Sequence, residues 1–161
     1  MRDRIQKGVL AGLAATIALT ILMLLKDLAG FAPRVDLVAL LSGALELPVW
    51  ASWIGHFLIG SVIWGVLFAV LAPKIPTSTC TAKAVMFSVA AWLLMQLVIL
   101  PLAGAGVFGA RYGIMAPVLT LALHVIYGAV LGAVYARLGG HWHEKSARGA
   151  GAQGALRYTH Y

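Results

Sequence analysis

Four long apolar runs, separated by short polar stretches, organise most of the chain. They cover about residues 8–25, 49–71, 84–103 and 117–138. A helix needs roughly 20 apolar residues to cross a bilayer, and each run has about that length. The alternation that marks the strands of a membrane barrel is absent, so helices must satisfy the backbone hydrogen bonds in lipid. The pattern therefore predicts an all-α membrane protein with four transmembrane helices.

Proline and glycine mark the ends of these runs. Pro73 follows the second run, and Pro101 breaks the end of the third. Pro117 suits the first position of the fourth helix, which we expect to end at Gly139 and Gly140. Residues 1–138 thus form the predicted transmembrane domain, and residues 139–161 form a polar, basic tail that we expect to be disordered or held by a partner or anionic lipid.

A shorter segment lies between the first and second runs. The stretch "RVDLVALLSGALELPVW" starts with an N-cap signal at Asp36, and its leucines are spaced for one helical face. We expect it to form a short interfacial or re-entrant helix. The N-terminus also resembles a signal peptide, but its apolar run of 18 residues exceeds the usual length of about 7–15, and no clean cleavage site follows.

Composition supports the membrane assignment and narrows the function. Of the 161 residues, 61% are hydrophobic and 11% are charged, against roughly 25% charged in soluble domains. Cys80 is the only cysteine, which excludes an intrachain disulfide and argues against a cysteine metal site. We find no Ser-His-Asp set, inward carboxylate pair, Walker motif or zinc signature, and therefore expect no enzyme activity of its own and no metal centre.

The net charge of +7 reflects orientation in the membrane rather than nucleic-acid binding. Four spans place both termini on one side, where the charges sum to +7, whereas the other side is neutral. The first side carries Arg2, Arg4, Lys7, Lys74, Lys83, Arg137, Lys145, Arg148 and Arg157 against Asp3 and Glu144. The second carries Lys26, Arg34 and Arg111 against Asp27, Asp36 and Glu46. Because basic loops stay inside, we expect cytoplasmic termini in a bacterial inner membrane.

The two halves of the chain resemble each other. A shift of 68 residues brings the second run onto the fourth, with His56 on His124 and Gly60 on Gly128. A shift of 76 residues brings the first run onto the third, with Lys7 on Lys83. Both shifts agree with the predicted spans, which favours two tandem, duplicated hairpins related by an axis along the membrane normal.

Depth along the helices, at about 1.5 Å per residue, groups four polar residues. His56 and His124 lie roughly 10 Å inward from the outer boundary, and Thr20 and Gln96 lie roughly 18 Å from the cytoplasmic one. In a core about 30 Å thick these depths nearly coincide. Polar groups facing lipid are costly, so the sequence predicts one inward-facing layer of Thr20, His56, Gln96 and His124.

This layer leaves three interpretations open. In the first, the imidazoles hydrogen-bond Thr20 and Gln96 in a tight bundle, with Gly60 and Gly128 allowing close helix approach. In the second, His56 and His124 are the axial ligands of a b-type haem and the two glycines make room for the macrocycle. Direct contact between the second and fourth helices, about 8–10 Å apart, would leave little space for one. In the third, the layer belongs to a transporter of protons, metal ions or a small solute.

Several stretches also resemble a known family. "KGVLAGLAATIALT", "HFLIGSVIWGVLFAVL", "LPLAGAGVFG" and "MAPVLTLALHVIYGAVLGAVYARL" look like an uncharacterised family of small bacterial four-span membrane proteins, over about residues 5–138. The resemblance implies an inner-membrane location and the four-helix layout, and it carries over no catalytic residue. We expect a non-enzymatic accessory or structural subunit of a membrane complex, with the tail as a contact to other subunits, the lipid bilayer as its surroundings and no nucleic-acid partner. A bis-histidine cytochrome and a small transporter are the alternatives.

Overall fold

The computed structural model describes residues 1–30, 38–39, 42–43 and 46–140. Of the short helix predicted before residue 50, residues 38–39 and 42–43 are described and are helical, and the remainder of its first part lies outside the described residues, as does the tail from residue 141 onward. Within the described residues the chain is helical and has no strand. The all-α prediction is confirmed.

Four helical rods are long and apolar enough to cross a membrane, namely Arg2–Leu28, Val49–Lys74, Cys80–Leu102 and Met115–Arg137. The first is α1 (Arg2–Leu28) and the last is α7 (Met115–Arg137). The second consists of α3 (Val49–Phe57), the π-helical η1 (Leu58–Ile63), α4 (Trp64–Leu71) and the 3₁₀ turn η2 (Ala72–Lys74). The third consists of α5 (Cys80–Leu94), the π-helical η3 (Met95–Ile99) and α6 (Leu100–Leu102), and is followed by the 3₁₀ segment η4 (Val107–Tyr112). We refer to these rods as spans 1 to 4.

The helix ends differ from the predicted ones by a few residues, for local reasons. Span 3 begins at Cys80 rather than near residue 84, because the Thr79 hydroxyl accepts a hydrogen bond from the Ala82 amide at 3.1 Å and caps the helix. Pro117 is the third residue of α7 and not the first; its missing N–H is still one of those that lack an intrahelical partner. The predicted end of span 4 is confirmed, since Gly139 has φ +75° and the Gly140 amide donates to the Tyr135 carbonyl at 3.0 Å.

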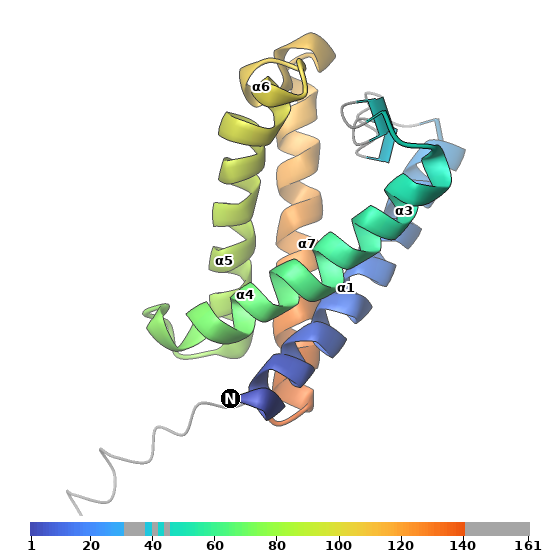
Figure 1. Cartoon of the computed structure of the whole chain (residues 1–161). Helices are drawn as coiled ribbons and strands as arrows, with labels where there is room; N and C mark the ends of the chain where they lie inside the picture. Colours follow the sequence, from blue (N-terminus) through green and yellow to red (C-terminus); the bar gives the residue numbers. More distant parts are fainter. Residues whose placement is uncertain (31–37, 40–41, 44–45, 141–161) are drawn as a thin grey trace, which may run out of the picture.

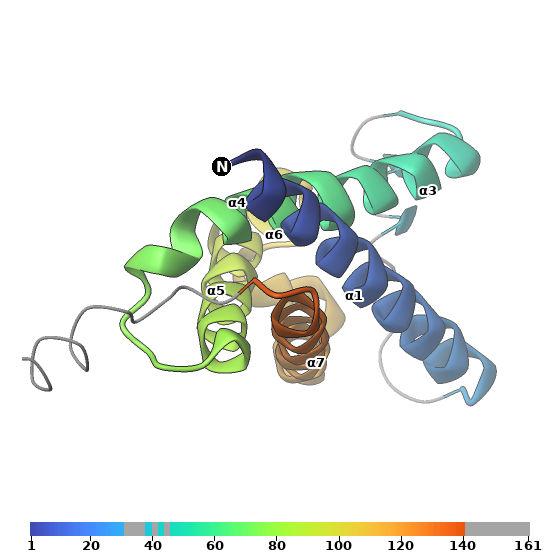
Figure 2. The same cartoon turned by 90° about the horizontal axis from the view of Figure 1, so that it is seen from below.

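The spans are arranged unequally. In Figures 1 and 2, α5 and α7 run side by side, while span 2 crosses the bundle at an angle and leaves span 3 toward the end that carries α6. Span 1 packs against α7 on one side and against η1 and α4 on the other. Span 2 therefore contacts span 1 along its middle but separates from span 3 toward the α6 end.

Charge distinguishes the two ends of the bundle. The basic end, at the bottom of Figure 1, holds the N-terminus and the last turn of α7, and the opposite end holds α6 and η4. Among the described residues the basic end carries Arg2, Arg4, Lys7, Lys74, Lys83 and Arg137 against Asp3. The opposite end carries Lys26 and Arg111 against Asp27 and Glu46. Between the ends, the helices expose large apolar side chains, as expected of a surface that faces lipid. On α1 these include Leu10, Leu13, Ile17, Ile21, Leu24 and Leu25.

Close helix approach inside each hairpin depends on small residues. A Cβ added to Gly8 would lie 2.3 Å from the Gly65 carbonyl oxygen, and one added to Gly128 would lie 2.7 Å from the Ala84 carbonyl oxygen. Both distances are too short for any side chain, so span 1 meets span 2, and span 3 meets span 4, almost backbone to backbone. Such contacts replace the hydrophobic effect as the source of helix association in lipid.

Two lysines at the basic end make equivalent bonds. The Lys7 ammonium donates to the Gly139 carbonyl at 3.3 Å, beyond the end of span 4. The Lys83 ammonium donates to the carbonyls of Ala72 and Ile75, at 3.1 and 2.7 Å, at the end of span 2. Cations stabilise helix C-termini, and the predicted repeat places Lys7 on Lys83 and span 2 on span 4. These bonds support the tandem duplication, which stays a prediction.

Candidate functional site

A pocket of about 330 Å³ lies between spans 2 and 3. All four spans contribute side chains to it. Spans 1, 2 and 4 supply Thr16, Leu19, His56, Ile59, Gly60, Trp64, His124 and Tyr127, and span 3 supplies Phe87, Ser88, Ala91, Leu94, Met95, Ile99, Leu100 and Ala103. This volume is at the lower end of the range of about 300–1,000 Å³ for small-molecule sites. Both histidines of the predicted layer thus face one cavity.

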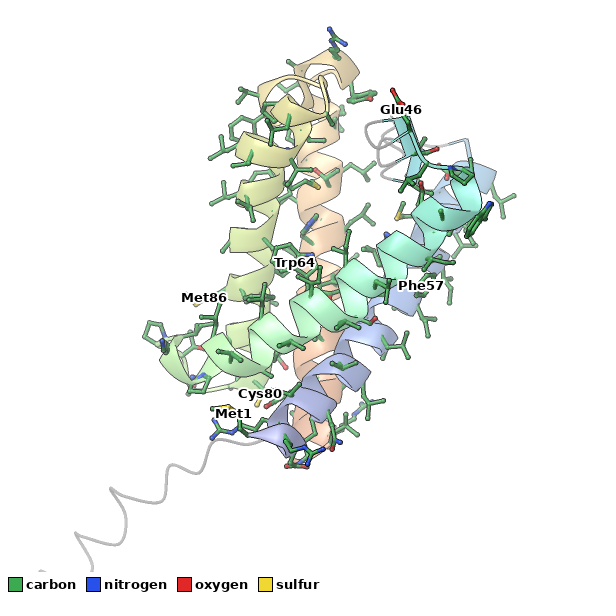
Figure 3. All side chains as sticks on the ribbon, in the orientation of Figure 1. Met1, Glu46, Phe57, Trp64, Cys80 and Met86 are labelled. Carbon is green, nitrogen blue, oxygen red and sulfur yellow. The ribbon has the colours of Figure 1, made fainter. Side chains whose placement is uncertain are left out.

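Two aromatic rings separate spans 2 and 3 at the pocket. The rings of Trp64 and Phe87 meet edge to face with their centroids 5.8 Å apart, and Figure 3 shows Trp64 in the angle between α4 and α5. The predicted repeat pairs Trp64 with Gly132 and Phe87 with Ala11. Ala11, which the predicted repeat pairs with Phe87, is small and fully buried, whereas a Cβ added to Gly132 would meet Thr81 and Cys80 of span 3.

His56 is held by a hydroxyl on span 1. The Thr20 hydroxyl donates its single hydrogen to the Thr16 carbonyl at 2.8 Å, so toward His56 the Thr20 oxygen can only accept. The His56 Nε2 atom lies 3.3 Å from that oxygen and therefore carries a proton. The contact between Thr20 and His56 that the sequence predicted is present.

His124 is held differently, by its own helix. Its Nδ1 atom lies 2.7 Å from the Thr120 carbonyl oxygen, which can only accept, so the proton is on Nδ1. The Nε2 atom is then a hydrogen-bond acceptor that has no partner among the described residues. A lone pair on a pocket-lining imidazole is the kind of group that binds a donor or a metal.

The hydroxyl groups of the pocket-lining residues are already engaged with backbone carbonyls. The Thr16 hydroxyl donates to Gly12 at 2.8 Å, and the Tyr127 hydroxyl donates to Gly60 at 2.6 Å. The Ser88 hydroxyl donates to the carbonyl of His124. Nε2 of His124 is therefore an acceptor that the pocket can offer to a ligand.

Two π-helical segments border the pocket, and sequence reasoning missed both. η1 begins two residues after His56 and includes Gly60, and η3 contains Gln96. A π turn leaves irregular carbonyls in a helix and is frequent at functional sites; here the Gly60 carbonyl accepts the Tyr127 hydroxyl. Pro101 was the one sequence signal for a broken helix, and it lies beyond η3, in α6.

The rest of the predicted layer is divided. Gln96 is fully buried, but it is not among the pocket-lining residues, and neither side-chain atom has a hydrogen-bond partner in the described part of the chain. The expected bond from an imidazole to Gln96 is thus missing, and His124 uses Thr120 instead. A Cβ on Gly60 would meet the Thr16 side chain at 2.3 Å. Gly60 and Gly128 therefore allow close helix approach within each hairpin, and Gly60 also lines the pocket.

The fit to a bis-histidine haem is partial. The His124 arrangement, with Nδ1–H on a carbonyl and Nε2 free, is typical of metal-ligating histidines. The His56 Nε2 proton, however, is bonded to Thr20, so ligation through both Nε2 atoms would break that bond. The described lining residues include no lysine or arginine for the propionates. In the described part of the chain no three His, Cys, Asp or Glu side chains gather as a metal-binding group.

Comparison with known proteins identifies the family to which the chain belongs. No curated protein and no solved structure matches the chain. A family model matches residues 2–146, nearly the whole chain. The protein with this four-span fold and intramembrane pocket belongs to a family of unknown function, DUF6789.

Proposed function

We propose that this protein is a non-enzymatic membrane protein that binds a small lipophilic ligand between spans 2 and 3. The observation that carries the proposal is the pocket of about 330 Å³, which both His56 and His124 line. Its surface is otherwise almost entirely apolar, and its remaining hydroxyls are bonded to backbone carbonyls. Such a site suits a ligand that is soluble in the membrane and fixed by one or two polar contacts.

The position of the pocket favours binding over transport. Its lining extends from Ala103, near the α6 end of the bundle, to Trp64 and Phe87. None of the described charged residues at the basic end lines it. A through passage would need polar groups on both sides of the aromatic pair, so we rank transport below ligand binding.

The test uses Trp64 as a reporter from inside the pocket. Protein in lipid nanodiscs is titrated with 4-bromo-3,5-dimethylanisole, whose bromine quenches tryptophan fluorescence on contact. We expect a saturable quenching component that is lost in Trp64→Phe and in Ala91→Leu, which fills the pocket. The matched control is Ala122→Leu, which adds the same atoms to an exposed position on α7 and should keep the component. Equal, non-saturable quenching in all four proteins would contradict the proposal.

We further propose that both termini face the cytoplasm of a bacterial cell and that the chain lies in the inner membrane. The excess of cations at the basic end supports this orientation. Fusions at the C-terminus test it, because green fluorescent protein matures in the cytoplasm and alkaline phosphatase is active in the periplasm. We expect fluorescence and no phosphatase activity; the opposite pair of results would reverse the orientation.

Haem binding is the second candidate, and the hydrogen bond from His124 Nδ1 to Thr120 is the observation that favours it. Absorption spectra of the oxidised and dithionite-reduced protein, purified from haem-replete cells, test it. A Soret band that disappears in both His56→Ala and His124→Ala would support a cytochrome. The accessory role in a membrane complex is a separate proposal that depends on the tail, which lies outside the described residues.

A further inference from the structure

We propose that the ligand of this pocket carries a neutral O–H group on an aromatic ring, as in phenols and hydroquinones, and that this group donates to Nε2 of His124. The inference rests on the proposed binding function and specifies the chemical class of the ligand. It follows from three separate features of the pocket: its polar anchor, its aromatic end and its opening to the membrane.

The polar anchor of the pocket, Nε2 of His124, favours a ligand that carries a hydrogen-bond donor. His124 Nδ1–H is fixed on the Thr120 carbonyl at 2.7 Å, so its Nε2 can only accept. His56 differs, because its Nε2–H lies on Thr20 at 3.3 Å. A ketone, an ester or an ether has no hydrogen to give to Nε2. A hydroxyl does, and a neutral hydroxyl enters an apolar site without the desolvation cost of an ion.

The aromatic residues that line the pocket favour a ligand with an aromatic ring. Trp64, Phe87 and Tyr127 all line it, and the first two meet edge to face. Aromatic rings favour further rings in edge-to-face or offset contacts, which add to simple burial. The Tyr127 hydroxyl is directed to the Gly60 carbonyl, which leaves the ring of Tyr127 as its contribution to the lining.

The pocket also reaches the lipid-facing surface. Leu94 and Ile99 line it, yet 45% and 51% of their surfaces are exposed. Leu94 is the last residue of α5 and Ile99 the last of η3, and span 2 separates from span 3 toward the α6 end (Figure 1). A ligand can therefore enter from the bilayer, and a hydrocarbon tail on its ring could remain among the lipids. These features together favour a lipid-soluble phenol or hydroquinone over a water-soluble solute.

The test compares two probes that differ in one hydrogen-bond donor. 4-Bromo-3,5-dimethylphenol and its methyl ether are titrated into nanodiscs, with Trp64 quenching as the readout. Wild type is compared with His124→Asn and His124→Gln. The asparagine amide can replace Nδ1–H on Thr120 but does not reach as far as Nε2, whereas the glutamine oxygen can take the place of Nε2. The ratio of phenol to ether affinity in each protein removes the difference in how the probes partition into lipid.

We expect the phenol-to-ether ratio to fall about tenfold in His124→Asn and to stay within about threefold of wild type in His124→Gln. Unchanged ether binding in His124→Asn shows that the variant is folded. A second measurement uses wild type only. In ¹⁵N-histidine spectra, the Nε2 signal of His124 should move upfield when the phenol is added and should not move when the ether is added. If both probes saturate but the ratio and the Nε2 signal stay constant, the ligand class is wrong and the proposed function stands. If neither probe saturates in wild type, both proposals fail.

Discussion

Two seams join the hairpins, and they differ where the predicted repeat makes them equivalent. The closed seam joins span 1 to span 4, which pack along each other. The open seam joins span 2 to span 3, which meet mainly through aromatic side chains and enclose the pocket. By the predicted repeat, Ala11 corresponds to Phe87 of the open seam, and Gly132, which faces span 3, corresponds to Trp64. The comparison shows that the two hairpins pack along each other at one seam and enclose a cavity at the other.

The largest expected effect comes from placing a ring in the closed seam. Ala11 is completely buried, with 0% of its surface accessible, and it packs in the core cluster. Ala11→Phe copies the residue at the equivalent position of span 3 and should lower the free energy of unfolding by about 3 kcal/mol through overpacking. Unfolding in mixed SDS micelles measures it. Ala122→Phe, at an exposed position, is the control, and an equal effect in both variants would contradict a closed seam.

The next effect separates the core from the pocket wall. Leu131 is fully buried in the core cluster, whereas Leu94 lines the pocket and is 45% exposed. Leu131→Ala should cost about 2 kcal/mol, because it leaves a cavity. Leu94→Ala should cost about 0.5 kcal/mol, because its neighbours already leave space around it. Thermal unfolding of the two variants in the same detergent compares them, and similar losses would mean that the open seam is packed as tightly as the core.

A smaller effect concerns the bond between spans 4 and 2 at the edge of the pocket. Tyr127→Phe removes the hydroxyl that reaches the Gly60 carbonyl at 2.6 Å. That carbonyl lies in the π-helical η1, and we expect a loss of about 1 kcal/mol. Hydrogen exchange of the amides in η1 should rise in this variant. Unchanged exchange there would show that the tyrosine does not stabilise the π segment.

The smallest effect concerns the hydroxyl that holds His56. Thr20→Val keeps the shape of the side chain and removes its bond to Nε2 of His56. Membrane hydrogen bonds of this kind average about 0.6 kcal/mol, so the variant should be nearly as stable as wild type. Its ligand affinity should change less than that of His124→Asn, since His124 is the proposed anchor. A larger loss of binding in Thr20→Val would exchange the roles of the two histidines.

Much of the fold followed from patterns that lipid enforces. Span length, the end of span 4 at Gly139 and the inward position of His56 and His124 depend on hydropathy, glycine and the cost of polar groups in lipid, all of which are local. The bond between Thr20 and His56 followed from depth alone. The sequence pattern gave no means of telling which face of each helix meets which neighbour. Gln96 has the predicted depth but lies away from the pocket.

The pocket itself was not predictable in this way. It depends on the volumes of Trp64 and Phe87 across a seam, and a single sequence does not show that these two rings lie opposite each other. The π segments depend on how each rod accommodates its neighbours, and a one-dimensional periodicity does not record that. The proton positions on the two imidazoles depend on single distances to Thr20 and Thr120. Of these three features, the pocket carries the proposed function, and the Nδ1–H of His124 carries the proposed ligand class.

The most direct test of the central claim is to identify what the pocket holds in the cell. Wild type, Ala91→Leu and Ala122→Leu are purified from the same membranes in mild detergent, extracted with organic solvent and compared by mass spectrometry. The account predicts one lipophilic, hydroxyl-bearing aromatic molecule that accompanies wild type and Ala122→Leu at near one per chain and is depleted in Ala91→Leu. An extract that contains bulk phospholipid alone, in equal amounts for all three proteins, would contradict it.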